Sequence, residues 1–392
     1  MSVYSFKSIG FWGRVFFAGA VILIGRLLWS MFGTSKLIPF LIIGIGFLFL
    51  EIRRQRLIDR AIKEISLKDN QELKEKILQL EAKRSLITTF FYLIKKMGLG
   101  KKSGLKFVNS HELADLGTNW IKEHLAKMMS LYEILNPFLL NSFLPPIKAV
   151  LCHNILNKKV FLGASIGCGL ARFEEKIAKY CNKKKLPAVI FATDINKDLI
   201  LKAKERMGKN GIMAGFQNVN HKIDIKKLVS YARNKQQSLV YLVPINVEDF
   251  PGLFGTDSKL DLVWFLQSRE HTIEGRPETF DKIKKFTKEW AILETFRSWG
   301  VILWGNLISW WLSPLFATET EISIARNYTP KEWVEKKIGV VIKRYPYFGW
   351  ILSGGAYKIL KESKFLRGGT KSLSRLLGLK DKLIFHPGRK YQ

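Results

Sequence analysis

The feature that most constrains the fold of this chain is a short strand that runs into a glycine-rich turn and then a helix. Residues 159–162 predict the strand, Gly163–Gly169 (Gly-Ala-Ser-Ile-Gly-Cys-Gly) form the turn, and Leu170–Tyr180 predict the helix. Glycines permit a tight turn and a close approach of the backbone to a ligand, and a helix N-terminus offers free N–H groups. This arrangement is typical of α/β folds that bind a nucleotide-like ligand.

A second strand, Ala188–Thr193, ends at Asp194, 25 residues after Gly169. An acidic residue in this place can accept hydrogen bonds from ribose hydroxyls. The alternative is a solvated aspartate and a glycine turn in an unrelated α/β protein. The alternation then continues, and it predicts a helix over 197–207, a polar and partly helical insertion over 208–238, strands over 239–243 and 260–266, a helix over 277–298, a strand over 300–306, a helix opening at 329, and strands over 339–345 and 356–360.

Residues 159–361 resemble the class I S-adenosylmethionine-dependent methyltransferases. Those enzymes have a Rossmann-like α/β sheet of seven strands, of which the last two form an antiparallel pair. The resemblance implies that the turn cradles the methionine part of S-adenosylmethionine, that Asp194 holds the ribose, and that Asn246 and Val247 flank the adenine. The cofactor-binding residues that it implies are Gly163, Ser165, Gly167, Gly169, Asp194, Ile195, Asn246, Val247 and Gln267.

The turn departs from the family pattern, acidic-x-Gly-x-Gly-x-Gly, at two positions. Gly163 stands where the acid is usual, and Ser165 stands at the first glycine. The Gly-x-Ser-x-Gly version and the segment Ala192–Ile195 are similar to those of the chemotaxis-receptor methyltransferases, although the full active-site pattern of that group does not follow. Asn246 replaces an acid, but an amide can still form a hydrogen bond with adenine.

Two other hypotheses stay open beside methyl transfer. The turn is also similar to the Gly-x-x-x-Gly-x-Gly turn of the short-chain dehydrogenases, which would make the chain an NAD(P)-dependent reductase. A Tyr-x-x-x-Lys does occur at Tyr231–Lys235, but it lies only 68 residues after Gly163, too early for that family's catalytic pair. The second hypothesis is a non-catalytic, membrane-associated interaction module that binds cofactor poorly, since the acid at Gly163 is missing.

Methyl transfer from a sulfonium needs few catalytic side chains, because the cofactor brings its own leaving group. If the acceptor carries a proton, a base assists, and His271 and Glu270 after the strand 260–266 are the candidates. The alternative is a histidine on a surface loop beside an ordinary acid. The three cysteines, Cys152, Cys168 and Cys181, have no ligand-like spacing, so no disulfide scaffold and no metal site are predicted.

The N-terminal end of the chain contains two apolar runs. Phe11–Phe32 is 22 residues long, and Leu37–Leu50 is 14 residues long with no charge. About 20 residues cross a bilayer as a helix, so we predict a transmembrane helical hairpin. An interfacial or re-entrant helix pair is the alternative, and a signal peptide is less favoured because the second run follows at once. Arginines after the second run place both ends, and the catalytic domain, on the cytoplasmic face.

The charge balance indicates an anionic partner. Lys and Arg outnumber Asp and Glu by 64 to 33, which gives a net charge of +31. The tail 362–392 intersperses leucines with cations, as in basic helices on anionic lipid, and no RNA-binding signature occurs. Membrane lipids with anionic headgroups are therefore the expected partner, ahead of nucleic acid. The expected methyl acceptor is a lipid, a lipid-linked small molecule or a membrane protein.

Four segments follow from these patterns. Residues 1–56 are the predicted membrane anchor, 57–150 a helical linker, 151–361 the methyltransferase domain and 362–392 the basic tail. The linker is predicted to break at Asn136–Pro137 and at Pro145–Pro146. Five of the eleven tryptophans lie between Trp290 and Trp311, at a point that the resemblance places beside the acceptor. The alternative is that they form part of a buried core.

Overall fold

The computed structural model divides the chain into two compact units. The helical unit comprises residues 1–128 and 297–326, and the sheet unit comprises residues 129–296 and 327–392. The residues that the structure describes are 34–66, 71–85, 137–157, 159–217, 223–254, 259–266, 277–295, 313–318, 339–346 and 355–363, together with single residues such as Trp120, Ser268 and Asn327.

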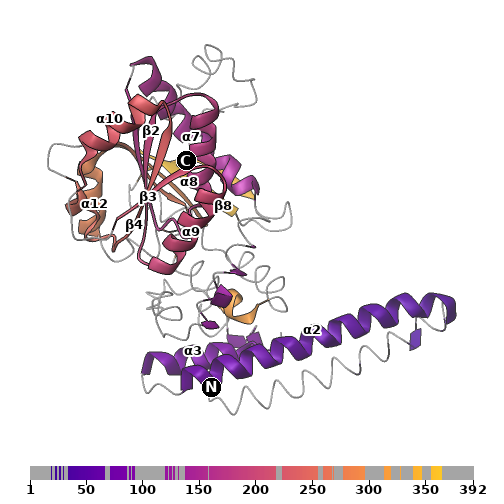
Figure 1. The fold of residues 1–392 in the computed structure, drawn as a ribbon. Helices are drawn as coiled ribbons and strands as arrows, with labels where there is room; N and C mark the ends of the chain where they lie inside the picture. The colour runs from indigo at the N-terminus through magenta and orange to yellow at the C-terminus, as the bar shows by residue number, and fades with distance from the viewer. Residues whose placement is uncertain are drawn as a thin grey trace, which may run out of the picture. The chain divides into compact units, whose positions relative to one another are not determined.

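The sheet unit is built on eight strands in the order β3-β4-β2-β1-β5-β6-β8-β7. Figure 1 shows this sheet with helices packed around it. All neighbours from β3 to β6 pair in parallel, whereas β8 is antiparallel to both β6 and β7. Without β3, the order contains the seven strands and the antiparallel last pair that the resemblance implies, so the predicted α/β sheet is confirmed. The strands are β1 Phe161–Ile166, β2 Ala188–Asp194, β3 Met213–Phe216, β4 Ser238–Pro244, β5 Leu260–Leu266, β6 Thr287–Thr295, β7 Val340–Pro346 and β8 Gly355–Leu360.

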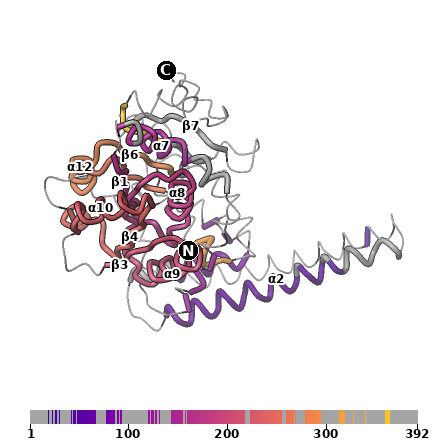
Figure 2. The backbone as a smooth tube through the Cα atoms, turned by 45° about the horizontal axis from the view of Figure 1, so that its top comes forward, coloured from indigo at the N-terminus to yellow at the C-terminus, as the bar shows by residue number. Residues whose placement is uncertain are grey.

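Helices cover both faces of the sheet, α10 and α12 on one side and α7 and α8 on the other (Figure 2). Each face has its own apolar core, one around Phe173 and Ile177 of α8 and the other around Phe250 and Ile283. The central strands are buried on both faces, which is why they read as continuous apolar runs. The helices are α7 Pro137–Leu156, α8 Arg172–Lys183, α9 Lys197–Lys209, α10 Ile225–Lys235 and α12 Pro277–Phe286, with a 3-10 turn, η1, at Phe250–Leu253.

The predicted long helix over 277–298 is wrong in its second half. Helix α12 ends at Phe286, and β6 occupies Thr287–Thr295. The four residues from Trp290 to Leu293 are all buried, with alternate side chains in the two cores, and β6 pairs with both β5 and β8. Burial on both faces removes the alternation that marks a strand, so the segment resembled a helix. The predicted strand over 300–306 lies outside the described residues.

Three further boundaries differ from the predictions. The insertion 208–238 contains β3, which adds a parallel strand beside β4 at the edge of the sheet. Strand β1 continues to Ile166, so the turn proper begins at Gly167. Pro145 and Pro146 lie inside α7 and do not break it. Burial of Phe143 and Ile147, each fully inaccessible to solvent, compensates for the backbone hydrogen bonds that the prolines remove.

The helical unit contains two long elements, α2 at Thr34–Ser66 and α3 at Gln71–Ala82. The second apolar run, Leu37–Leu50, forms the first part of α2, and most of the first run lies outside the described residues. Across the part of the chain that the structure describes, no helix is both long and apolar enough to cross a membrane. The predicted transmembrane hairpin is therefore not supported. The predicted segment boundaries after residues 56 and 150 fall inside the continuous helices α2 and α7.

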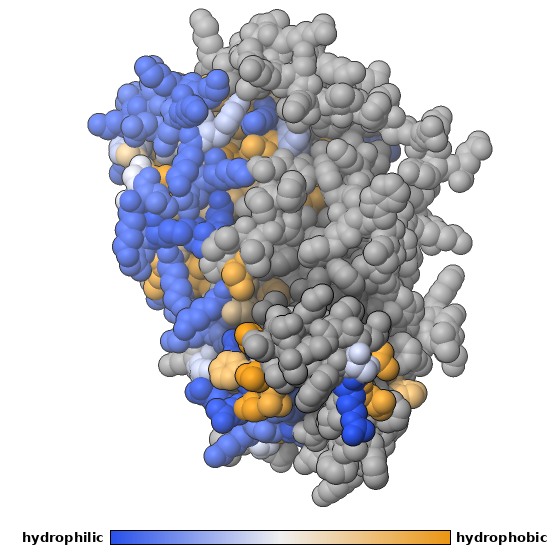
Figure 3. All heavy atoms as spheres, turned by 90° about the vertical axis from the view of Figure 1, so that its right-hand side faces the viewer, coloured by the Kyte–Doolittle hydropathy of each residue, from blue (hydrophilic) through white to orange (hydrophobic). Residues whose placement is uncertain are grey.

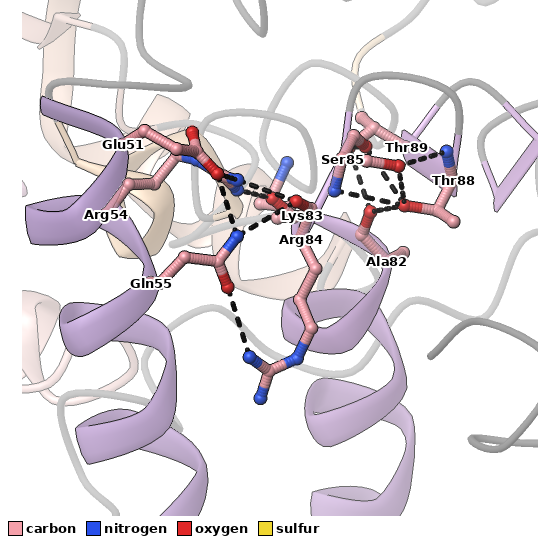
Figure 4. Close-up of polar contacts among 9 residues, drawn as sticks. All are labelled: Glu51, Arg54, Gln55, Ala82, Lys83, Arg84, Ser85, Thr88 and Thr89. Carbon is pink, nitrogen blue, oxygen red and sulfur yellow. Dashed lines mark hydrogen bonds and ion pairs between the residues drawn. The ribbon is translucent and has the colours of Figure 1, made fainter. Parts of the chain in front are cut away.

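A buried arginine joins α2 to the C-terminal end of α3 (Figure 4). Arg54 is fully inaccessible to solvent and forms an ion pair with Glu51. Its guanidinium also donates to the carbonyl oxygens of Lys83 and of Arg84, the latter at 2.6 Å, and Gln55 donates to the same Arg84 oxygen at 3.0 Å. The last carbonyls of a helix have no partner within the helix, so a cation there satisfies them and opposes the helix dipole.

The core of the helical unit unites both of its chain segments. Ile58, Ala61 and Ile65 of α2 pack with Leu80 of α3 and with Leu315. Leu315 belongs to the segment 297–326, which lies between β6 and β7 in the sequence but is part of the helical unit. The segment that follows the fifth strand of the expected methyltransferase sheet is therefore part of the same core as α2 and α3.

We expect Arg54→Leu to destabilise the helical unit by about 3 kcal/mol, because it removes the cation that pairs with the partly buried Glu51 and the guanidinium donors to the Lys83 and Arg84 carbonyls. Hydrogen exchange of the α3 amides in the full chain measures the effect. Arg56→Leu, which changes an exposed arginine on the same helix, is the matched control and should alter protection by less than about 0.5 kcal/mol. Equal protection of α3 in the two variants would contradict the assigned role.

Candidate functional site

The candidate site lies where three neighbouring parallel strands, β4, β2 and β1, end. The register pairs Ile166 with Thr193 and Asp194 with Pro244, so the residues that follow these strands meet at one edge of the sheet. In open parallel sheets ligands bind at the carboxyl edge, next to the turn that follows the first strand. Gly167, Asp194 and Asn246, three of the predicted cofactor-binding residues, are each partly exposed there.

The turn itself has a conformation that requires its glycines. Gly167 has a φ of 69° and Gly169 a φ of 54°, both in the left-handed region that glycine adopts at little cost. The Cys168 amide donates to the Thr193 carbonyl at 2.9 Å, and the Ala171 amide donates to the Cys168 carbonyl at 2.8 Å. The turn is thus fixed both to the end of β2 and to the start of α8, so the sequence prediction of a structured glycine turn is confirmed.

Asp194 holds this turn with its side chain. Its Oδ2 atom accepts from the Gly169 amide at 2.8 Å, and its Oδ1 atom accepts from the Asn196 amide at 2.9 Å. The Asp194 carbonyl also accepts from the Ile245 amide at 2.9 Å, which links β2 to the end of β4. Asp194 therefore holds the turn, the Asn196 amide and the end of β4 together at this edge of the sheet.

Ile195 follows Asp194 directly, and the predicted adenine-flanking pair, Asn246 and Val247, follows the neighbouring strand β4. The Ile195 side chain is 53% exposed, although it is large and apolar. Asn246 uses its Oδ1 atom to accept from the Glu248 amide at 3.4 Å, and Val247 is buried. An exposed apolar side chain next to a polar amide and a carboxylate offers a surface for a flat heterocycle that is joined to a ribose.

The other two residues of the pattern, Gly163 and Ser165, lie inside β1. A Cβ atom on Gly163 would come within 2.6 Å of both the Phe161 ring and the Trp264 ring. No acid fits at Gly163, which is the physical reason for the departure from the family pattern. Ser165 is buried, and its carbonyl accepts from the Thr193 hydroxyl at 2.8 Å. Direct contact of Gly163 and Ser165 with a cofactor stays a prediction.

A buried acid that the sequence analysis missed lies behind the turn. Glu174, at the third position of α8, is 1% exposed and accepts from the Trp264 indole nitrogen at 3.0 Å. Burial raises the pKa of Glu174, while the hydrogen bonds from Ser165 and Trp264 favour its charged form and offset part of that rise. The carboxyl group thus connects β1, β5 and α8. An acid in the first turn of a helix is common, so no sequence signal distinguished it.

A second acid, Glu175, fixes α8 to α9. The Arg206 guanidinium donates to Glu175 at 2.8 Å and also to the Leu170 carbonyl, directly after the turn. Asn210 donates to the other Glu175 oxygen at 2.8 Å. Burial acts to raise the pKa of Glu175, but its bonds with Lys179 and Arg206 outweigh burial and keep it below the usual value. Neighbouring helices therefore hold the far side of the turn as well.

Several predicted residues lie outside the described part of the chain, namely Gln267, Glu270, His271 and the tryptophans from Trp299 to Trp311. Ser268 between them is described, and its hydroxyl donates to the Ile166 carbonyl at 2.5 Å, which joins the end of β5 to the end of β1. At the end of β6, Glu294 is fully buried and accepts from the Asn327 amide at 3.3 Å. No local sequence pattern marks this further buried carboxyl group, which lies at the carboxyl edge.

The remaining candidate groups do not form a reactive centre. Within the described ranges, no set of three or more His, Cys, Asp or Glu residues is placed to hold a metal ion. Cys152 and Cys181 are buried, and burial raises the pKa of Cys181 to about 12, so this thiol stays protonated. Tyr231 and Lys235 lie in the second half of α10, which leads into the amino end of β4. They are thus at the opposite end of the sheet from the turn.

No protein-family model and no curated protein matches this sequence. Among solved structures, the plantazolicin methyltransferase BpumL in complex with SAH is 13% identical, with a TM-score of 0.38 over 75% of this chain and 93% of BpumL. The plantazolicin methyltransferase BamL, also with SAH, is 11% identical, with a TM-score of 0.38 over 59% of this chain and 73% of BamL. The bifunctional kinase-methyltransferase WbdD is 10% identical, with a TM-score of 0.34, and the chain covers 39% of it.

Likenesses as distant as these carry no argument about function. The sheet itself defines the class of fold, through the order β4-β2-β1-β5-β6-β8-β7, the antiparallel last pair and the glycine turn after β1. These are the features that the resemblance to class I methyltransferases implies.

We expect Glu174→Leu to lower the free energy of unfolding by about 2 kcal/mol or more, because it leaves the Trp264 N–H and the Ser165 hydroxyl buried without an acceptor. Glu174→Gln keeps an acceptor oxygen and serves as the control. The pKa of Glu174 in the folded state is raised above the ordinary value of 4.5. Its protonated form therefore stabilises the folded wild type below about pH 4.5, and this stabilisation is lost as the pH rises through the folded-state pKa.

The glutamine variant should therefore show a flatter dependence of stability on pH above about 4.5 than the wild type. Thermal unfolding of the three proteins across this pH range measures the difference. Parallel pH profiles for wild type and Glu174→Gln would contradict a raised pKa at Glu174.

Proposed function

We propose that this chain transfers a methyl group from S-adenosylmethionine to an acceptor. The observation that supports this most is the Asp194 carboxylate, which holds the glycine turn at the edge of β1, β2 and β4, where the resemblance to class I methyltransferases implies the acid that binds ribose. The backbone of Gly167–Gly169 would bind the methionine part, Asp194 the ribose, and Ile195 with Asn246 the adenine.

S-adenosylmethionine, when bound, supplies an activated methyl group and its own leaving group. The chain's task is then to hold the cofactor, to orient the acceptor in line with the methyl group and to exclude water. The rigid support of the turn by Asp194, Glu174 and Arg206 suits this task, because positioning errors of about 1 Å are costly in such reactions. His271 and Glu270 remain the proposed bases for an acceptor that carries a proton.

Calorimetric binding of S-adenosylhomocysteine to the full chain tests the cofactor site, with NADPH in parallel. We expect Asp194→Ala to weaken binding by about tenfold or more, because hydrogen bonds to a charged group contribute about 1.5–3 kcal/mol and the turn loses its anchor. Asp198→Ala, which changes an exposed acid in the first turn of α9, is the matched control and should bind as the wild type does.

Tight NADPH binding without binding of S-adenosylhomocysteine would contradict the proposal and favour the reductase. That outcome is disfavoured by the position of Tyr231 and Lys235 in α10, at the opposite end of the sheet. Binding of neither ligand would favour the non-catalytic interaction module.

We further propose that the acceptor is a lipid, a lipid-linked small molecule or a membrane protein, and that the chain works at the cytoplasmic face of a membrane. The net charge of +31 and the apolar N-terminal runs support this proposal.

Membrane and soluble fractions, incubated with the full chain and methyl-labelled S-adenosylmethionine, provide the test. We expect label in the membrane fraction and about a hundredfold less with His271→Gln, the loss typical of a missing base. Label confined to soluble molecules would contradict this proposal.

A further inference from the structure

Helix α2 presents apolar side chains to solvent over the first part of its length. Ile42, Ile45, Phe49 and Ile52 are 65%, 66%, 68% and 44% exposed. Their spacing of three and four residues places them on one face of the helix, which we name the α2 stripe. Leu48, 60% exposed, flanks it. Large apolar side chains gathered in this way mark a surface that binds a partner.

The same face of α2 becomes basic further along the helix. Arg53, Arg56, Arg60 and Lys63 are exposed and continue the stripe with the same spacing of three and four residues. Arg60 also forms an ion pair with Glu64 at 3.2 Å. Figure 3 shows exposed apolar side chains close to strongly polar ones in the lower part of that view. The stripe therefore changes from apolar to cationic within one turn of the helix.

The opposite face of α2 packs inside the helical unit along the basic part of the helix. Arg54, Ile58, Ala61 and Ile65 are buried there, again at helical spacing. In Figure 1, α3 lies along the C-terminal half of α2, and the first half of α2 extends beyond the end of α3. The Arg54 network joins this buried face to the residues that follow α3 (Figure 4).

We infer that the α2 stripe inserts into an anionic phospholipid bilayer, with Ile42–Phe49 among the acyl chains and Arg53 and Arg56 at the headgroup phosphates. From Ile42 to Ile52 the stripe is about 15 Å long, and a helix that lies in the plane of the interface buries such a face about 5–10 Å deep, at the boundary between headgroups and acyl chains. Apolar contact together with cations at the phosphates is the pattern of interfacial helices. This inference deepens the proposed membrane location and does not depend on the cofactor site.

Charge distinguishes lipid from a second copy of the chain as the occupant. A copy would bring its own arginines and a further net charge of +31 to the same surface. Anionic headgroups instead neutralise Arg53 and Arg56, and arginine forms paired hydrogen bonds with phosphate. The apolar and the basic parts of the stripe are thus both satisfied by the same partner.

Photo-crosslinking tests this inference on the full chain, reconstituted with vesicles of phosphatidylcholine and phosphatidylglycerol. Benzoylphenylalanine replaces Phe49 in one variant and Tyr231, an aromatic residue that is 41% exposed on α10, in the matched control. We expect at least about tenfold more lipid adduct at position 49 than at position 231, because only an inserted residue meets acyl chains. Equal lipid yields at the two positions, or an adduct of twice the chain mass at position 49, would overturn the inference.

The basic part of the stripe has its own test. Arg53→Gln with Arg56→Gln should reduce adduct formation at position 49 on the order of tenfold in these anionic vesicles, since each cation at the surface contributes to binding. Lys202→Gln with Lys226→Gln changes two exposed cations of the sheet unit and is the control. Equal yields in the two pairs would overturn the assignment of Arg53 and Arg56 to the headgroups. Calorimetry with S-adenosylhomocysteine on the same samples separates failure of the cofactor site from failure of this inference.

Discussion

The hydrogen bond from the Gly169 amide to the Asp194 carboxylate is the interaction on which the candidate site depends. It closes the turn after β1 onto the end of β2, in a conformation that two glycines with positive φ make accessible. The second carboxylate oxygen accepts from Asn196, and the Asp194 carbonyl accepts from Ile245. One residue therefore positions the ends of three neighbouring strands, and the surface they form follows from it.

The acid that the family pattern expects at Gly163 has no room in this chain, because the Trp264 ring fills the space beside it. The indole nitrogen of the same ring donates to Glu174, which the N-terminus of α8 carries. A buried carboxyl group therefore still supports the turn, but α8 carries it, and not β1. The absence of an acid at Gly163 therefore follows from packing. It gives only weak support to the hypothesis that the chain has no cofactor site.

The sequence predicted the glycine turn, Asp194 and strands β2, β4, β5, β7 and β8 because these features depend on local chemistry and short apolar runs. It failed at β6, whose two buried faces remove the strand pattern, and at Pro145 and Pro146, where burial of Phe143 and Ile147 outweighs proline. Glu174 and Glu294 could not be predicted either. Their position depends on partners such as Trp264, 90 residues away from Glu174, and no local pattern encodes such a contact.

The composition of the helical unit connects the two proposals of location and of chemistry. The segment 297–326 follows the end of β6, and β6 ends at the same edge of the sheet as the strands before the turn and Asp194. Leu315 of this segment packs with α2 and α3. The resemblance to class I methyltransferases implies that a segment at this place in the sequence borders the acceptor. Its side chains are also part of the core that holds α2, so the helix that we assign to lipid and the segment that follows β6 share one hydrophobic core. A substitution that loosens this core is therefore expected to disturb α2 and the segment that follows β6 together.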